Sequence, residues 1–475
     1  MKILSGIRYN TLILFILFIV CAVFAILFPT EESAFYKANY TTLLGGLIVC
    51  SLILSIKLKD RNLFLFDPFL FASILSFCIF FIQPMIDILE GGVIYYGWVY
   101  PAYGCQKATI VFVVSYLAFA CGYFLLKGNA NCSLSIYQSL TENQKNKISF
   151  LSLFLWIVFT SCCIAFFLFN GYSLRYIFSL GQLGNIQIDE IFSRAGFLWK
   201  FSGSMIVCLL YYLCFGNNKI LKLIMFLISM NIMLLNGGRA GILVLFLAPL
   251  VYYYAKKGKN PPLQHIIIFG ISFLILSAVV QTARWSLRSG GSVQRQMQWT
   301  IEDIIEPMRS NFRVYNLYYL IVDAMPDKID YFKGKETLLY TGIMFIPRSL
   351  WPNKPDAPFR EIVRYVAGDL AVMNGEAFPG LTEPYIDFGW IGCLIYSFIA
   401  GCLIAKLRNL YVYSRGDTHG LILYSIFYAD IFQAIIRGYI PSFFYSILCI
   451  LFPYFILKLL VPVSQRKTVK YRENK

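Results

Sequence analysis

The chain has 475 residues, of which 58% are hydrophobic and only 14% charged, and its mean hydropathy is +0.65. Soluble globular proteins carry roughly 25% charged and about 45–50% apolar residues, so this composition excludes a soluble domain, a disordered chain, a coiled coil and a disulfide-stapled secreted scaffold. The net charge of +16 does not indicate nucleic-acid binding, because much of the excess lies in short segments between apolar runs. The composition predicts an all-α polytopic membrane protein.

Apolar runs long enough to cross a bilayer, which takes about 20 residues, recur along the chain and predict about 12 transmembrane helices. The first run is not a cleavable signal peptide, because its apolar core is too long and further spans follow it. The expected spans are 11–29, 41–56, 64–84, 106–126, 148–169, 199–216, 220–236, 240–255, 263–282, 388–406, 420–436 and 441–460.

Basic residues in the short loops predict which side of the membrane each loop occupies. With the N-terminus in the cytoplasm, 15 Lys and 6 Arg fall on the cytoplasmic side, whereas the short loops on the other side hold few bases. Cytoplasmic loops are enriched in Lys and Arg, so we expect both termini to be cytoplasmic.

The spans divide the chain into three regions. Residues 1–282 form an N-terminal bundle of about nine helices with a small outer loop at 171–198, and residues 388–475 form the C-terminal helices and a basic cytoplasmic tail. Between them, residues 283–387 form a large, mainly helical outer loop with 12 basic and 13 acidic residues. A long polar loop on a lipid-buried protein is where chemistry is expected.

The basic residues of the large loop differ in type from those on the cytoplasmic side. The loop holds 8 Arg and 4 Lys, the reverse of the cytoplasmic preference. A guanidinium presents a planar set of donors that matches phosphate and carboxylate oxygens. Ion pairs with the loop's own acids account for most of these arginines individually, but the set as a whole predicts an anionic substrate.

Two further arginines lie at the outer ends of spans, where a charge is costly. Arg239 follows two glycines in the segment 236–241, and Arg437 closes the eleventh span. An ionisable residue at membrane depth is a functional candidate, and glycines allow a ligand to approach the backbone closely. The alternative is an arginine that reaches out to lipid headgroups.

The segment 345–355 combines three prolines with an aromatic residue and two bases. The prolines fix the backbone, Trp351 offers an interfacial aromatic face, and Arg348 and Lys354 carry positive charge. A rigid cationic turn at the membrane surface is suited to docking a lipid-linked phosphate. The alternative is an ordinary aromatic anchor.

Three carboxylates approach the start of the tenth span and are the available general bases: Glu376, Glu383 and Asp387. Salt bridges to loop arginines are the alternative role. Both histidines, His265 and His419, fall on the cytoplasmic side, which excludes a histidine base from the outer site. The sequence has no nucleotide-binding or serine-hydrolase motif and no metal-binding run in this loop, so we expect neither metal nor cofactor.

These segments resemble the O-antigen polymerase (Wzy) family, and most closely its branch of oligosaccharide repeat unit polymerases and the enterobacterial common antigen polymerase. The likeness lies in residues 237–240, which open a span, in residues 345–355 of the long outer loop, and in residues 169–175 after a span. The order of spans, with the large loop toward the C-terminus, is also similar.

The resemblance implies a GT-C-like fold and a glycosyltransferase acting at the periplasmic face of the bacterial inner membrane. The growing glycan on undecaprenyl pyrophosphate would be the donor, and a fresh lipid-linked repeat unit the acceptor, in a metal-independent inverting transfer. We expect Arg239, Arg348 and Arg437 to bind the pyrophosphate. Support is expected from Arg284, Arg288, Lys354 and Arg175, glycan or lipid contacts from Trp351 and Tyr385, and the base from Glu383, Glu376 or Asp387.

Three other functions stay open at this point. An O-antigen ligase uses the same donor, but ligases rely on a histidine in the outer loop, which this loop lacks. A lipid-linked oligosaccharide flippase is a transporter, and flippases usually have short outer loops and charges deep within spans. A non-catalytic assembly partner is the third alternative. A chain-length regulator is a further partner that the sequence neither requires nor excludes.

Overall fold

The computed structural model describes most of the chain, except for the N-terminal region and parts of the loops. The described residues are 45–46, 49, 65–89, 94–95, 98–99, 102–127, 134–137, 140–169, 203–235, 239–262, 264–272, 275, 309, 312–344, 346, 350–374, 376–414, 417–462 and 465–469.

Long helices make up most of the described chain. The N-terminal part contains α3 (Pro68–Phe77), the π-helical η3 (Cys78–Ile82), α4 (Gln83–Leu89), α5 (Ala102–Leu126), α6 (Glu142–Phe169), α9 (Met205–Phe215), α10 (Lys219–Leu235) and α11 (Arg239–Lys257). The rest contains α14 (Tyr315–Ala324), the π-helical η5 (Lys335–Tyr340), α15 (Thr341–Ile343), α16 (Phe359–Asn374), α17 (Thr382–Tyr413), α18 (Thr418–Ile436) and α19 (Ile440–Leu460).

Five helices in the described part of the chain are long and apolar enough to cross a membrane: Gly104–Leu126, Glu142–Phe166, Thr382–Tyr413, Thr418–Ile436 and Ile440–Leu460. They confirm five of the expected spans as helices. The runs 64–84 and 199–216 correspond to the shorter apolar helices Pro68–Ile82 and Met205–Phe215. The run 11–29 lies outside the described residues, and the run 41–56 almost entirely so. The protein is therefore a helical multi-pass membrane protein.

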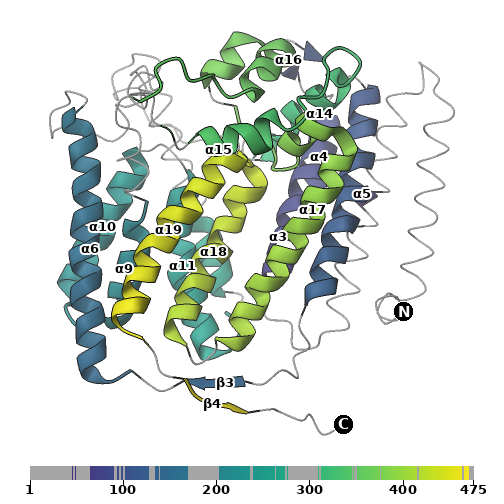
Figure 1. Ribbon diagram of the computed structural model, residues 1–475. Helices are drawn as coiled ribbons and strands as arrows, with labels where there is room; N and C mark the ends of the chain where they lie inside the picture. The colour runs from purple at the N-terminus through teal and green to yellow at the C-terminus, as the bar shows by residue number, and fades with distance from the viewer. Residues whose placement is uncertain are drawn as a thin grey trace, which may run out of the picture.

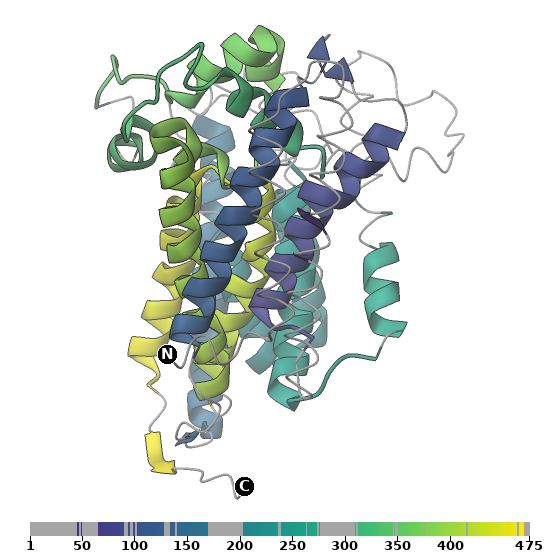
Figure 2. The same cartoon turned by 90° about the vertical axis from the view of Figure 1, so that its right-hand side faces the viewer.

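The helices form one bundle with different structures at its two ends. Figure 1 shows α14, α15 and α16 gathered at one end, and Figure 2 shows the same grouping from the side. The opposite end carries a small antiparallel pair of strands, β3 (Leu134–Tyr137) and β4 (Gln465–Val469). A second short pair, β1 (Ile94–Tyr95) and β2 (Trp98–Val99), precedes α5. The described part of the large loop thus forms a helical cap over one end.

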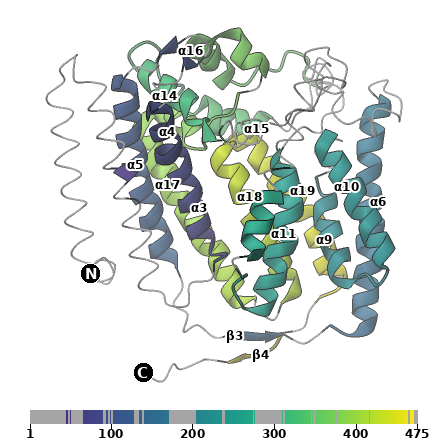
Figure 3. The same ribbon diagram turned by 180° about the vertical axis from the view of Figure 1, so that it is seen from behind.

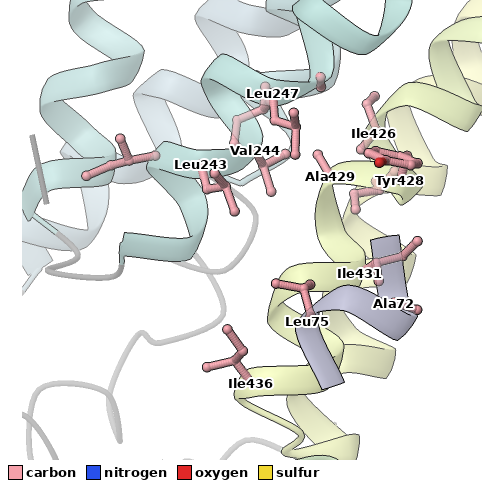
Figure 4. Packing of buried hydrophobic residues seen from close by; sticks show 14 of the residues in the cluster. Ala72, Leu75, Leu243, Val244, Leu247, Ile426, Tyr428, Ala429, Ile431 and Ile436 are labelled. Atoms are coloured by element: carbon pink, nitrogen blue, oxygen red, sulfur yellow. The ribbon is translucent and has the colours of Figure 1, made fainter. Parts of the chain in front are cut away.

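Antiparallel packing of α11 against α18 forms the middle of the core, as seen from behind in Figure 3. Figure 4 shows Leu243 and Leu247 of α11 with Ala429 and Ile431 of α18, and Leu75 of α3 beside them. All of these side chains are buried. Because lipid is as apolar as leucine, such close van der Waals packing, rather than hydrophobic exclusion, holds membrane helices together.

Helix α17 breaks near its start, at Gly389, whose φ of 63° and ψ of −146° are outside the helical region. The backbone N–H groups of Phe332 and Lys333 donate to the carbonyls of Ile386 and Asp387, each at 3.0 Å. These carbonyls therefore bond to the large loop instead of to the next turn of α17. The part of α17 before this break, residues 382–388, belongs structurally to the cap, and it carries two of the predicted carboxylates.

Two of the loop arginines share one buried aspartate, Asp87, which lies in α4 and not among the loop's own acids, where the sequence predicted their partners. Asp87 accepts hydrogen bonds from Arg309 (3.1 Å) and Arg313 (3.3 Å), from the Tyr315 hydroxyl (2.5 Å) and from the Gln83 amide (2.9 Å). Both arginine side chains are less than a quarter exposed. This network fastens the start of α14 to the end of the α3–α4 segment.

Replacing Asp87 with alanine should lower the free energy of unfolding by about 1–3 kcal/mol, because two partly buried guanidiniums lose their shared carboxylate. Thermal unfolding of the detergent-solubilised protein measures the effect. The control is Asp369→Ala, which breaks an exposed pair with Arg364 and should change the stability by less than about 0.5 kcal/mol. Equal losses in the two variants would contradict the buried-network interpretation.

Candidate functional site

Several predicted site residues fall where the structure gives no side-chain description. Arg175, Arg284, Arg288 and Arg348 lie outside the described residues. For Arg239 the backbone is described, as the first residue of α11, but the side chain is not.

The position of Arg239 along the bundle follows from the far end of α11. Asn260, just beyond that helix, accepts a hydrogen bond from the Leu65 amide at 2.7 Å. Leu65 is followed closely by Asp67, which pairs at 3.2 Å with Arg408 near the end of α17. α11 therefore ends at the end of the bundle where α17 ends and α18 starts. Arg239 opens α11 at the opposite end, where α18 meets α19 (Figures 1 and 3).

Arg437 occupies the turn between α18 and α19, at the end of the bundle covered by the large loop. Desolvation lowers the pKa of Arg437 below its usual range, and the negative charge of Glu376 opposes that shift. The Arg437 side chain is nevertheless exposed and that of Glu376 partly exposed. The Arg437 guanidinium is thus partly desolvated by neighbouring protein atoms but still reached by solvent, and the Glu376 carboxylate lies near it.

Two glycines lock the segment after Glu376 against the turn that carries Arg437. Gly438 donates to the Phe378 carbonyl at 3.1 Å, and Gly380 donates to the Ile435 carbonyl at 3.2 Å. A Cβ atom on Gly438 would lie 1.8 Å from the Cα of Gly380, so neither position has room for a side chain. This backbone contact brings together residues that the sequence places far apart.

Glu383 is fully buried in the first turn of α17. Its Oε2 accepts a hydrogen bond at 2.9 Å from the backbone N–H of Ile440, the first residue of α19. A carboxylate is stabilised at a helix N-terminus because the unpaired N–H groups there carry partial positive charge. The second oxygen, Oε1, has no hydrogen-bond partner.

Asp387 is also fully buried and caps the start of η5. Its Oδ1 accepts from the Glu336 amide at 3.1 Å, and its Oδ2 accepts from the amide and the hydroxyl of Thr337 at 2.6 and 2.5 Å. Both oxygens of this predicted base are thus engaged with the cap. This geometry gives Asp387 a role in holding the large loop on α17.

Glu336 belongs to the same region and was missed by sequence reasoning. It is fully buried. Its Oε2 accepts a hydrogen bond at 2.7 Å from the backbone N–H of Phe359, the first residue of α16. Burial raises the pKa of Glu336 to about 8; the Phe359 N–H lowers it and the charge of Asp387 raises it further. No local pattern marks this residue, because its burial depends on contacts with α16 and α17.

The proline-rich segment has an internal anchor and an exposed aromatic. Lys354 is 9% exposed and donates to the carbonyls of Met344 (3.0 Å) and Ile346 (3.1 Å), so its ammonium holds the turn together. Trp351 is 37% exposed. Tyr385, the other predicted contact residue, is buried and donates to the Met325 carbonyl at 3.2 Å.

His419 lies at the start of α18, at the other end of that helix from Arg437. Its Nδ1 is 2.8 Å from the Tyr211 hydroxyl and its Nε2 is 3.1 Å from the Val461 carbonyl. This histidine is therefore remote from the described acids and bases of the large loop.

The described part of the site offers a guanidinium and a carboxylate that solvent reaches. Arg437 can bind phosphate oxygens, and Glu376 can accept a proton. Glu336 and Glu383 are buried, and each accepts a hydrogen bond from the first residue of a helix, α16 and α19 respectively.

Comparisons with known proteins give one result. No curated protein and no solved structure matches the chain. A family model described as O-antigen polysaccharide polymerase Wzy matches residues 9–467, nearly the whole chain. The chain therefore belongs to the O-antigen polysaccharide polymerase Wzy family.

Proposed function

We propose that this protein joins undecaprenyl-pyrophosphate-linked repeat units into O-antigen-type polysaccharide at the periplasmic face of the bacterial inner membrane. The family supports polymerisation of O-antigen repeat units, with lipid-linked oligosaccharides as substrates. The observation that carries the site is the proximity of Arg437 and Glu376 at the end of the bundle covered by the large loop.

In this proposal Arg437 binds the pyrophosphate that links the growing glycan to its lipid. A hydroxyl of the fresh repeat unit attacks the anomeric carbon of the donor sugar and loses its proton to Glu376. The bond from that carbon to the pyrophosphate oxygen breaks, and the oxygen leaves with the electron pair. The guanidinium stabilises the charge that builds on this leaving group. One displacement inverts the anomeric centre, and the residues named here require no metal.

The base is assigned to Glu376 because of the three predicted carboxylates it is the one that solvent reaches. Glu383 and Asp387 are both fully buried. Glu383 accepts from the start of α19, and Asp387 accepts three hydrogen bonds at the start of η5. We assign these two carboxyls to positioning the turn and the loop around the site.

The remaining predicted residues have supporting roles in this proposal. Arg239 opens α11 at the same end of the bundle as Arg437 and is a second pyrophosphate ligand. Trp351 offers an exposed face for lipid or glycan, and Arg348, from the same proline-rich segment of the sequence, is a further proposed pyrophosphate ligand. Arg175, Arg284 and Arg288 remain proposed contributors to the same anionic site.

A lipopolysaccharide gel of a deletion strain tests this function. A polymerase deletion should leave single repeat units attached to lipid A core, and the wild-type gene should restore the ladder. Loss of all surface glycan would instead indicate a flippase or a ligase. Complementation with Glu376→Gln should leave single units, because the amide cannot accept the proton, whereas Glu361→Gln, on an exposed part of α16, should restore the ladder. A full ladder with Glu376→Gln would reject this base.

A further inference from the structure

Three buried carboxyls of the large loop and α17 each hold the start of a different helix. Asp387 accepts from η5, Glu336 accepts from Phe359 at the start of α16, and Glu383 accepts from Ile440 at the start of α19. Since Ile440 follows the turn that carries Arg437, the geometry of that turn depends on Glu383.

Two of these carboxyls, Glu336 and Glu383, form a pair. They lie within electrostatic reach of one another, and Tyr439 lies within reach of both. Each is fully buried, and each has one oxygen, Oε1, with no hydrogen-bond partner. A buried polar atom without a partner is costly, and a buried anion more so.

Among the described residues, no cation acts on Glu336 or Glu383. The nearby Lys354 ammonium lies 5.7 Å from the centroid of the Tyr340 ring and donates to the carbonyls of Met344 and Ile346. The titratable groups that act on Glu336, Glu383 and their neighbour Tyr439 are Asp387 of α17, Tyr340 of η5 and Tyr396 of α17. All of these are acids. Two like charges that share a buried site cannot both ionise easily, so one of them keeps a proton.

We propose that Glu336 and Glu383 hold a proton at neutral pH and that its release displaces the turn carrying Arg437. With the proton bound, the pair carries at most one negative charge and both helix starts stay in place. When the proton leaves to solvent, two buried anions within electrostatic reach of one another repel, and the first turns of α16 and α19 separate. Glu336 and Glu383 are thus positioning residues, and their effect on catalysis rests on the role proposed for Arg437.

The direction of the pH effect follows from the raised pKa of Glu336. The pKa of Glu336 in the folded protein, about 8, exceeds the ordinary glutamate pKa of 4.5, so the stability that this group contributes is fully present below about pH 4.5. It is lost as the pH rises through about 8. The wild-type unfolding midpoint in detergent should therefore fall as the pH rises from 5 to 9. In Glu336→Gln, which cannot ionise, the fall over this range should be smaller by about 2–4 °C.

The matched control is Glu361→Gln, an exposed glutamate in the first turn of α16, which should keep the wild-type profile. Should Glu336→Gln fold poorly, Glu336→Ala also removes the titrating group and should give a flatter profile with a lower midpoint. An infrared band of a protonated carboxyl in the wild type, present at pH 7 and lost by pH 9, gives a further readout. A wild-type pH profile in both Glu336 variants, or no such band, would overturn the proposal.

Activity separates this proposal from the proposed function. The ratio of polymerisation rates at pH 9 and pH 7 should be about threefold higher or more in Glu336→Gln than in the wild type. If the unfolding profile changes as expected but Arg437→Ala polymerises normally, the proton-holding pair stands and the catalytic role of Arg437 is wrong. If Arg437→Ala is inactive but the unfolding profile of Glu336→Gln matches the wild type, the catalytic role of Arg437 stands and the proton-holding pair is wrong.

Discussion

Replacing Arg437 with alanine is expected to abolish long glycan chains while single repeat units still reach lipid A core. The guanidinium is exposed beside Glu376 in the turn between α18 and α19. Removing one group that stabilises charge on a leaving group typically lowers the rate about 10²–10³-fold. Lipopolysaccharide gels of the complemented deletion strain show the chain lengths, and turnover of lipid-linked repeat units by purified protein gives the rate.

Two variants frame this result. Arg437→Lys keeps the charge but loses the planar set of donors, so it should retain partial activity with shorter chains. Arg364→Ala removes an exposed arginine that pairs with Asp369 on α16, and its ladder should match the wild type. A wild-type ladder from Arg437→Ala would remove the main ligand from the proposed pyrophosphate site.

Gly438→Ala is expected to be the most destabilising small substitution near the site. The added Cβ would lie 1.8 Å from the Cα of Gly380. Because the Gly380 Cα is a backbone atom, no side-chain rotation can relieve the clash. The segment after Glu376 would have to separate from the end of α18. We expect a loss of about 3 kcal/mol or more in the free energy of unfolding, measured by thermal unfolding in detergent, together with loss of polymer.

A matched control is Gly342→Ala, in the short helix α15. No atom lies within 4 Å of a Cβ built at Gly342, and alanine favours helix over glycine by roughly 1 kcal/mol. This variant should therefore fold at least as well as the wild type. Normal stability of Gly438→Ala would show that the two glycines are farther apart than the structure places them.

The spans were the most predictable part of the fold, and their ends the least. Long apolar runs predicted the bounds of α5, α18 and α19 to within four residues, whereas α6 begins at Glu142, six residues before its expected start at 148. The start of α17 was expected at 388, yet the helix begins at Thr382. The part of α17 before the break at Gly389 contains Glu383 and Asp387, which the sequence placed in a polar loop. They are buried because they cap other helices, a tertiary effect that hydropathy does not contain.

For the candidate site, too, the sequence indicated the types of residue but not which of them are buried. The rarity of charges at span ends was enough to indicate Arg437, and the need for a base indicated Glu376. The sequence could not tell which carboxylate stays exposed, so Glu376, Glu383 and Asp387 ranked as equals. Glu336 was invisible because it is one acid among many in a polar loop, and its burial depends on α16 and α17.

The pairing of β3 with β4 joins the last strand of the chain to the connection between α5 and α6. The same junction is reinforced by Lys147 of α6, which donates to the Leu460 carbonyl at 3.1 Å. A force that pulls on the C-terminus would therefore act on the hydrogen bonds between β3 and β4 before it acts on α19. A reporter fused beyond β4 would lie at the end of the bundle opposite the turn that carries Arg437 (Figure 1), away from the proposed pyrophosphate site.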